Sequence, residues 1–409
     1  MRTIRADRYG YGAREGRASL PTGMQDQGRA CDARMSMAMG ENEVPTWPTT
    51  LAMGNGVVVA GVARWNRKVM GALLREFDAT PRIAADIAEG IGIAQREGRT
   101  LVAWAAKLTT AMERRATEAG IAVVRIEDGF LRSVGLGAGL VPGACFALDG
   151  RGIHYDATRP SDLEHLLAHA DVSPAEMQHG AHLAALIAGN RLSKYNLGGV
   201  PQHLPPTFGR ARILVPGQVA DDAAVRCTLS DTIDLRAANI NLALLRAARE
   251  RNPGAFIVYK PHPDVVRGLR PGEVAPEDVR ALADAEMADA DILDLIAQCD
   301  RVETLSSLTG FEALIRGKPV TVHGAPFYAG WGLTQDLTAL PRRGRWRTLA
   351  ELVYLSLVRY CRAVDPERLE PLSCEQLIAR LAEIKARPPR RALAAARMRL
   401  SWVGHKLGL

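Results

Sequence analysis

The chain has 409 residues, of which 47% are hydrophobic, and its formal net charge is +7. A chain of this length usually folds into more than one domain, and its apolar content is too high for an intrinsically disordered protein. The basic excess favours anionic partners, such as nucleotides, acidic sugars, nucleic acid or an anionic membrane surface, without choosing among them.

Residues 1–45 are rich in Gly, Arg, Asp and Met and lack sustained periodicity, so we expect them to be disordered or a non-native extension. Short apolar runs and helical patterns then alternate: strand 56–62, helix 65–77, strand 101–107, helix 110–119 and strand 121–126. This alternation is typical of βαβ units with a parallel sheet. It predicts a first domain over residues 46–205, which ends in a proline-rich linker.

A second series of apolar runs follows the linker. The predicted strands cover residues 212–215, 255–259, 301–305 and 319–323, and the predicted helices cover 234–251, 291–298 and 311–316. This series predicts a second parallel-sheet domain over residues 206–345. We expect residues 346–409 to be helical, with one helix over 349–361 and a basic tail over 388–409. The tail suits packing on the protein or contact with an anionic membrane surface.

Cysteine spacing and the length of the apolar runs bear on metal binding and on location. The six cysteines form no C-x-x-C pair, so neither a zinc ribbon nor a disulfide framework is indicated, and we expect no metal. No apolar run approaches the roughly 18 residues that a membrane-spanning helix needs. The sequence therefore predicts a cytoplasmic protein.

Two adjacent carboxylates, Glu127 and Asp128, follow the third predicted strand and precede Gly129. Ligands of open parallel sheets bind just beyond the carboxyl ends of the strands, so this position suits function. Adjacent carboxylates raise each other's pKa, which helps one of them act as acid, base or nucleophile in glycosyl transfer. The alternative is a solvated turn, because E-D-G is a common turn sequence.

Two loops of the second predicted domain suit phosphate binding. His262 lies between two rigid prolines close to Lys260, where the two side chains can hold the phosphate of a leaving nucleotide. Ser306 and Ser307 open a predicted helix and can form an anion site with its free N–H groups. Glu312 in its first turn can bind a ribose hydroxyl or favour the helix dipole. The alternatives are a capped turn at His262 and ordinary helix capping by the serines.

Aromatic residues gather in the loop F-Y-A-G-W-G at 327–332, although aromatics make up only 5% of the chain. Aromatic faces stack on sugars and bases, and glycine permits a close approach, so Tyr328 and Trp331 are candidates for sugar contact. The alternative is a hydrophobic plug between domains.

Several of these segments, taken together, resemble one family. They are EDGFLRSVGLG at 127–137, SKYN at 193–196, PGQV at 216–219, KPHP at 260–263 and the stretch 306–332. The set resembles the capsule polysaccharide biosynthesis proteins of the KpsC type, which are β-Kdo transferases. It is also similar to bacterial sialyltransferases, which share an acidic motif, an H-P motif and a hydroxyl-bearing phosphate loop. The match extends from about residue 57 to residue 345.

The resemblance implies an α/β fold of the GT-B glycosyltransferase type, with two Rossmann-like domains that face a cleft. It implies retaining transfer of the acidic sugar Kdo from CMP-Kdo, a donor substrate rather than a cofactor, to a lipid-linked glycan at the cytoplasmic face of the inner membrane. Asp128 would be the leading catalytic carboxylate, with Glu127 as its partner and His262 acting on the leaving phosphate. The motifs and the resemblance together assign donor binding to Gln218, Lys260, His262, Ser306, Ser307 and Glu312, and sugar or acceptor contact to Arg132, Tyr328 and Trp331.

One departure from the family pattern concerns the number of modules. Proteins of the KpsC type commonly carry two transferase modules, whereas E-D-G-F and K-P-H-P each occur once here. We therefore expect a single module. The other interpretations are a transferase for another CMP- or UDP-activated sugar and a non-catalytic component of capsule assembly or export. The expected partners are the donor, the acceptor, capsule assembly or export proteins and an anionic membrane surface, but not nucleic acid, for which no docking motif is present.

Overall fold

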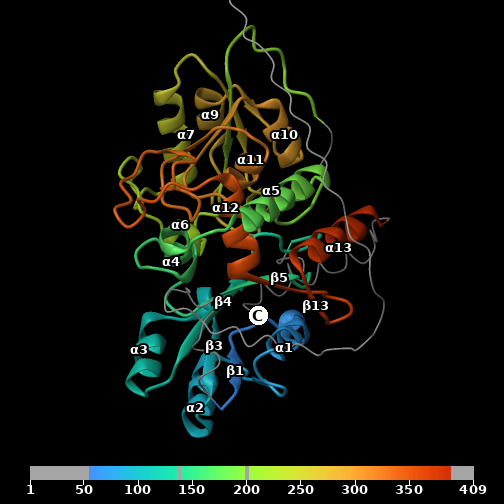
Figure 1. Cartoon of the computed structure of the whole chain (residues 1–409). Coiled ribbons are helices and arrows are strands. Elements are labelled where there is room, and N and C mark those ends of the chain that lie inside the picture. Colours follow the sequence, from blue (N-terminus) through green and yellow to red (C-terminus); the bar gives the residue numbers. More distant parts are fainter. Residues whose placement is uncertain (1–54, 137–139, 199–201, 388–409) are drawn as a thin grey trace, which may run out of the picture. The chain divides into compact units, whose positions relative to one another are not determined.

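The computed structural model describes residues 55–136, 140–198 and 202–387. These residues belong to one compact unit, which contains two β-sheets (Figure 1). The predicted extension 1–45, the predicted basic tail 388–409 and part of the predicted linker lie outside the described residues. Within the described ranges, no helix is both long enough and apolar enough to cross a membrane.

The first sheet has seven strands in the order β13-β12-β5-β4-β3-β1-β2. Four of them run parallel: β1 (Val57–Ala60), β2 (Arg82–Ile83), β3 (Thr100–Trp104) and β4 (Val123–Asp128). Antiparallel pairing then adds β5 (Cys145–Asp149), β12 (Cys361–Val364) and β13 (Pro371–Leu372). Strands from both ends of the chain therefore share one sheet.

Helices cover both faces of the parallel part of this sheet. They are α1 (Arg67–Leu74), α2 (Ile87–Glu97) and α3 (Thr110–Glu118). Val57 and Val59 of β1 pack into the apolar cluster that contains α1, whereas Val58 and Ala60 pack into the cluster that contains α2. Because successive strand residues point to opposite faces, a continuous apolar run such as β1 is what a strand covered on both sides requires.

The second sheet has six strands, all parallel, in the order β11-β10-β9-β6-β7-β8. They are β6 (Arg212–Pro216), β7 (Phe256–Lys260), β8 (Ala285–Glu286), β9 (Arg301–Thr304), β10 (Val320–Val322) and β11 (Gln335–Asp336). Numbered from β6, this is the 3-2-1-4-5-6 order of a Rossmann sheet. The order reverses between β6 and β9, where the loops after the two strands diverge and leave room for a ligand.

Six helices accompany this sheet in the described part of the chain. They are α6 (Ala223–Arg226), α7 (Ile240–Arg251), α8 (Pro263–Val266), α9 (Pro276–Leu282), α10 (Ile292–Gln298) and α11 (Thr309–Ile315). Helix α7 begins later than the helix predicted from residue 234. The reason is that Asn239 caps it by accepting hydrogen bonds from the N–H groups of Asn241 and Leu242.

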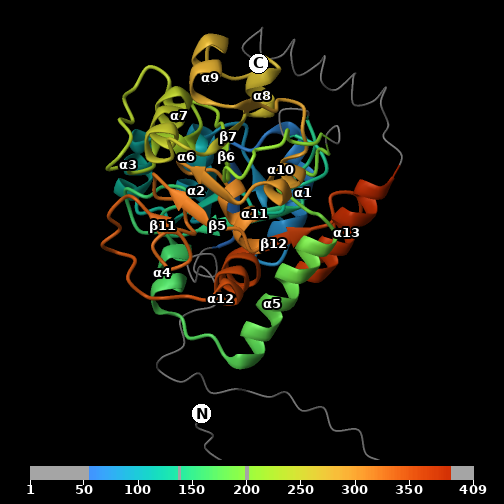
Figure 2. The same ribbon diagram turned by 90° about the horizontal axis from the view of Figure 1, so that it is seen from above.

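The remaining helices lie side by side in Figures 1 and 2. They are α4 (Asp162–His169), α5 (Pro174–Gly189), α12 (Leu349–Tyr354) and α13 (Cys374–Ala386). Helix α5 crosses α12 so closely that a Cβ atom at Gly180 would lie 2.0 Å from the carbonyl oxygen of Ala350, which only glycine avoids.

The C-terminal segment differs from the purely helical prediction. The helix predicted over 349–361 is present as α12 and a π-helical continuation, Leu355–Tyr360. The chain then forms β12 and β13 and returns to the first sheet beside β5. The pairing joins residues more than 200 positions apart, as in Cys361 with Ala147. No local sequence pattern therefore predicts it.

Candidate active site

A pocket of about 650 Å³ is lined by residues at the carboxyl ends of strands from both sheets. The loops after β4, β6, β7 and β9 line it, together with the loop after α5. It brings together most of the predicted site residues, namely Glu127, Asp128, Gln218, Lys260, His262, Ser306, Ser307, Glu312 and Tyr328. Arg132 and Trp331 are not among the residues that line it.

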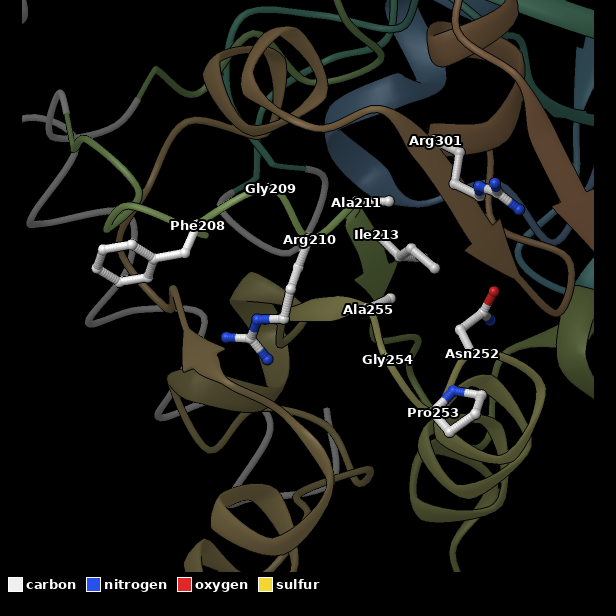
Figure 3. Close-up of a pocket in the computed structure, with 10 residues that line it drawn as sticks. All are labelled: Phe208, Gly209, Arg210, Ala211, Ile213, Asn252, Pro253, Gly254, Ala255 and Arg301. Atoms are coloured by element: carbon white, nitrogen blue, oxygen red, sulfur yellow. The ribbon is translucent and has the colours of Figure 1, made fainter.

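A second hollow, of about 460 Å³, lies at the other edge of the six-stranded sheet (Figure 3). Its residues come from the loop before β6, from the turn before β7 and from the start of β9 (Figure 3). Phe208 at its rim is 95% exposed. None of the predicted site residues lines this hollow, and ligands of open parallel sheets bind at the opposite, carboxyl edge. The first pocket is therefore the candidate site.

The acidic loop is positioned by tight packing at the end of β4. Glu127 and Asp128 are the last residues of that strand. The N–H of Gly129 donates to the Cys145 carbonyl oxygen at 2.9 Å, and a Cβ atom at Gly129 would lie 2.5 Å from the Cys145 Sγ. Only glycine permits this close approach, and it sets the direction in which the chain leaves Asp128.

Asp128 is oriented by a buried arginine. Arg132 Nε donates to Asp128 Oδ2 at 2.6 Å, and the two remaining guanidinium nitrogens donate to Ser133 Oγ at 2.8 Å and to the Val141 carbonyl oxygen at 3.1 Å. The Arg132 residue is only 2% exposed, so it lies behind the pocket wall rather than at a sugar. Asp128 Oδ1 is buried and has no hydrogen-bond partner in the described part of the chain.

Glu127 differs from Asp128 in its electrostatics. Burial and the neighbouring charge of Asp128 raise the pKa of Glu127 to about 8. The N–H of Asp128 donates to Glu127 Oε1 at 3.1 Å, but this bond does not offset the two larger effects. Glu127 is therefore mostly protonated at neutral pH, and the acidic loop can carry a proton beside an arginine-paired carboxylate.

Gln218 connects the two loops at the point where the strand order reverses. Its Nε2 donates to Ser306 Oγ at 3.0 Å, and its Oε1 accepts from the N–H of Ser306 at 2.9 Å. Asn241 holds the backbone of Gln218 through two further bonds. The neighbouring Ser307 hydroxyl accepts from the N–H of Thr309, the first residue of α11, whose N-cap residue is Leu308. Both serines thus lie in the pocket with their hydroxyls already engaged in the protein.

His262 presents one defined nitrogen to a ligand. Its Nδ1 accepts from the N–H of Asp264 at 3.1 Å, at the start of α8. Burial lowers the pKa of His262, although the charges of Asp264 and Asp222 oppose this. The ring is therefore neutral at neutral pH, and its proton must be on Nε2, where it can be donated to a phosphate oxygen.

Lys260 and Glu312 have structural partners within the pocket wall. Lys260 Nζ donates to the Ala288 carbonyl oxygen at 2.6 Å, and burial lowers the pKa of this lysine. Glu312 Oε1 accepts from the N–H of Lys194 at 2.8 Å, and burial raises the pKa of the Glu312 carboxyl. These two side chains therefore hold the loops around the pocket. The donor binding predicted for them would be a second role beside these structural hydrogen bonds.

The aromatic loop is mostly buried. Tyr328 is fully buried, and its hydroxyl donates to the Ser307 carbonyl oxygen at 2.5 Å. Trp331 is also fully buried, and its Nε1 donates to the Phe327 carbonyl oxygen at 2.8 Å. Phe327 stacks on Phe130 with their ring centroids 4.3 Å apart. Trp331, predicted to contact a sugar, instead packs in the apolar core next to the pocket.

Sequence reasoning left several pocket residues without a role: Lys194, Tyr195, His154, Tyr155 and Asp222. Lys194 and Tyr195 belong to the S-K-Y-N segment that contributes to the family resemblance, which is the signal that could have identified them. The other three lie in segments without a recognisable motif. The fold alone brings them to the pocket.

Comparison with known proteins gives matches over most of the described chain. The model of a family described as "Capsule polysaccharide biosynthesis protein" matches residues 100–205 and 207–364. The capsule polysaccharide modification protein LipA of Neisseria meningitidis serogroup B is 44% identical over 265 residues, which are 65% of this chain and 37% of LipA. The lipopolysaccharide-processing protein LpsZ of Rhizobium meliloti is 38% identical over 313 residues, which are 75% of this chain and 70% of LpsZ. The chain thus spans about 37% of the length of LipA.

Two solved structures from Thermosulfurimonas dismutans share the fold. The KpsC structure described as a beta Kdo 2,7 transferase has a TM-score of 0.64 and 32% identity, and the match covers 80% of this chain and 99% of that one. The KpsC structure described as a beta Kdo 2,4 transferase has a TM-score of 0.66 and 33% identity, and the match covers 80% and 97%. Together with the two Rossmann-like sheets, these matches confirm the predicted α/β fold of the GT-B type.

Proposed function

Because the chain belongs to the family of capsule polysaccharide biosynthesis proteins, we propose that it is a glycosyltransferase that moves Kdo from CMP-Kdo to a lipid-linked glycan with retention of configuration. The KpsC-type resemblance of its motifs is confirmed by this membership and by the two KpsC matches. This family membership supports a role in capsule polysaccharide biosynthesis. We propose in addition the identity of the donor, the identity of the acceptor and the stereochemistry of transfer.

One observation carries the proposal. A single pocket combines an arginine-paired carboxylate, Asp128, with residues suited to a nucleotide phosphate at the edge of a Rossmann sheet. Donor phosphate near the loops after β6, β7 and β9 would receive a hydrogen bond from the Nε2–H of His262. The reacting carbon of the sugar would then point towards Asp128, on the loop after β4.

In the proposed reaction, the bond between the anomeric carbon and the phosphate oxygen breaks, and CMP leaves with the electron pair. The acceptor hydroxyl oxygen then bonds to the anomeric carbon and gives its proton to the departing phosphate of CMP. Asp128 stabilises the cationic character of the sugar or forms a transient bond with it. Protonated Glu127 keeps a second negative charge away from this carbon and from the anionic donor.

Incubation with CMP-Kdo and a Kdo-primed lipid tests the proposal. We expect release of CMP and extension of the acceptor, and we expect Asp128→Asn to abolish transfer while the melting temperature stays within a few degrees of wild type. Transfer by Asp128→Asn at the wild-type rate would remove Asp128 from the mechanism. Failure of the wild-type protein to release CMP with any Kdo-bearing acceptor would contradict the function.

A different activated sugar is the main competing donor. Thermal-shift measurements with CMP, UDP and GDP distinguish the nucleotides, because a ligand that binds only the folded state raises the melting temperature. We expect stabilisation by CMP alone. The acceptor, the capsule assembly or export partners and the contact of residues 388–409 with an anionic membrane surface stay predictions. Liposome sedimentation with and without these residues tests the membrane contact.

A further inference from the structure

The backbone of Lys194 is held from two sides. Its N–H donates to Glu312 Oε1, on α11, at 2.8 Å. Its carbonyl oxygen accepts from the N–H of Arg132 at 3.0 Å, in the loop after β4. The same Arg132 orients Asp128. Lys194 is therefore attached both to the acidic loop and to the helix that follows β9.

A rigid turn holds the backbone from which the Lys194 side chain extends. Asn196 has a φ of 49°, in the left-handed region that asparagine tolerates better than most residues. Its Oδ1 accepts from the N–H of Ser193 at 2.9 Å, and its Nδ2 donates to the Ser133 carbonyl oxygen at 3.0 Å. Because Asn196 is buried and fully bonded, the turn has little freedom to move the lysine.

In the described part of the chain, the Lys194 ammonium lines the pocket without a hydrogen-bonded or ion-paired partner. In the described residues it forms no hydrogen bond and no ion pair, and its contact is with the ring of Tyr195, whose centroid is 5.3 Å from Nζ. The two other lysines that line the pocket, Lys260 and Lys385, each donate from Nζ to a backbone carbonyl oxygen. Lys194 is therefore the pocket lysine that is free to bind a ligand.

The charge of Lys194 is maintained by its surroundings. Burial by itself lowers the pKa of Lys194, but Tyr195, Asp128, Asp222 and Glu127 together raise it above the usual range. The side chain is consequently an ammonium at neutral pH. A partly buried ammonium without a hydrogen-bonded partner is costly, and an anionic ligand would remove that cost.

We propose that Lys194 binds the carboxylate of the donor sugar and thereby selects sugars whose anomeric carbon carries a carboxylate over neutral sugars. This inference rests on the proposed function, because it takes the pocket to be the donor site. In a 2-keto acid sugar such as Kdo, the carboxylate is bonded to the carbon that leaves the phosphate. The group that recognises it must therefore lie between the nucleophile and the phosphate site.

Lys194 occupies such a position. It lines the same pocket as Asp128 and His262, and its backbone is hydrogen-bonded to Arg132 of the acidic loop on one side and to Glu312 of α11 on the other. The phosphate has its own donor in the Nε2–H of His262, on a loop of the second sheet, whereas Lys194 is attached to the loop that carries Asp128. The carboxylate is thus the donor anion that the position of Lys194 fits.

Two ligands in one assay test the inference, because CMP has the phosphate without the carboxylate and CMP-Kdo has both. Lys194→Met should lower kcat/KM for CMP-Kdo about 10- to 100-fold, as expected for the loss of a charge-assisted hydrogen bond, and should change the inhibition constant of CMP less than about threefold. Lys194→Arg keeps the charge and should recover part of the loss. Lys68→Met, at an exposed position of α1 outside the pocket, is the control and should leave both constants near their wild-type values.

The outcomes separate the inference from the proposed function. An equal loss for CMP and CMP-Kdo in Lys194→Met would assign Lys194 to the phosphate or to the shape of the pocket and would overturn the inference. Unchanged kcat/KM in Lys194→Met, with an active wild-type protein, would overturn it as well. A wild-type protein that neither uses CMP-Kdo nor binds CMP would overturn the proposed function and the role of Lys194 with it. Melting curves check that each variant is folded.

Discussion

Glu127→Gln replaces a carboxyl group that ionises with an amide of the same shape that does not. Because burial and the charge of Asp128 raise the pKa of Glu127 to about 8, the carboxyl is protonated in the lower part of the assay range and ionised in the upper part. The protonated fraction falls from roughly nine tenths at pH 7 to about one tenth at pH 9. Ionisation adds a negative charge next to Asp128 and to an anionic donor. We therefore expect kcat/KM of the wild type to fall about tenfold between these two pH values.

The assay is CMP release from CMP-Kdo, followed from about pH 6 to about pH 9 at donor concentrations below KM. Glu127→Gln should keep at least about a third of the wild-type kcat/KM at neutral pH, because the amide imitates the protonated carboxyl, and it should lack the decrease at high pH. Glu118→Gln, at an exposed position of α3 outside the pocket, should show the wild-type profile. The same decrease with the same midpoint in Glu127→Gln would show that another group causes it and would refute the reasoning.

Two further predictions concern stability. Arg132→Leu leaves the half-buried Asp128 carboxylate unpaired and should lower the free energy of unfolding by about 1–3 kcal/mol, and adding Asp128→Asn should recover part of this loss. Urea denaturation of the single and double variants measures the effect, and strictly additive losses would contradict the coupling. Gly180→Ala places a Cβ atom 2.0 Å from a carbonyl oxygen of α12 and should cost about 1–3 kcal/mol, visible as a lower melting temperature. Gly189→Ala, where nothing lies within 4 Å of the added Cβ, should be neutral or slightly stabilising. Equal melting temperatures for Gly180→Ala and Gly189→Ala would contradict the close packing of α5 against α12.

The local elements of both sheets follow from the sequence because their causes are local. The runs Val57–Ala60 and Phe256–Lys260 are apolar enough to predict buried parallel strands, and each has a neighbouring strand on both sides in its sheet. The acidic loop and the K-P-H-P loop follow predicted strands directly, so their presence at one pocket could be expected from the rule for parallel sheets. The combination of motifs was also sufficient to identify the family.

The sequence by itself thus determined the parallel strands, their order of appearance along the chain and the loops that follow them. The tertiary structure alone decided which side chains face the pocket. It buried Trp331 and Arg132, left the ammonium of Lys194 without an ion-pair partner among the described residues, and added the distant strand β12 to the first sheet. The physical reason is that strand periodicity depends on neighbours in the chain, whereas burial, ion pairing and pKa depend on segments that only the folded protein brings together.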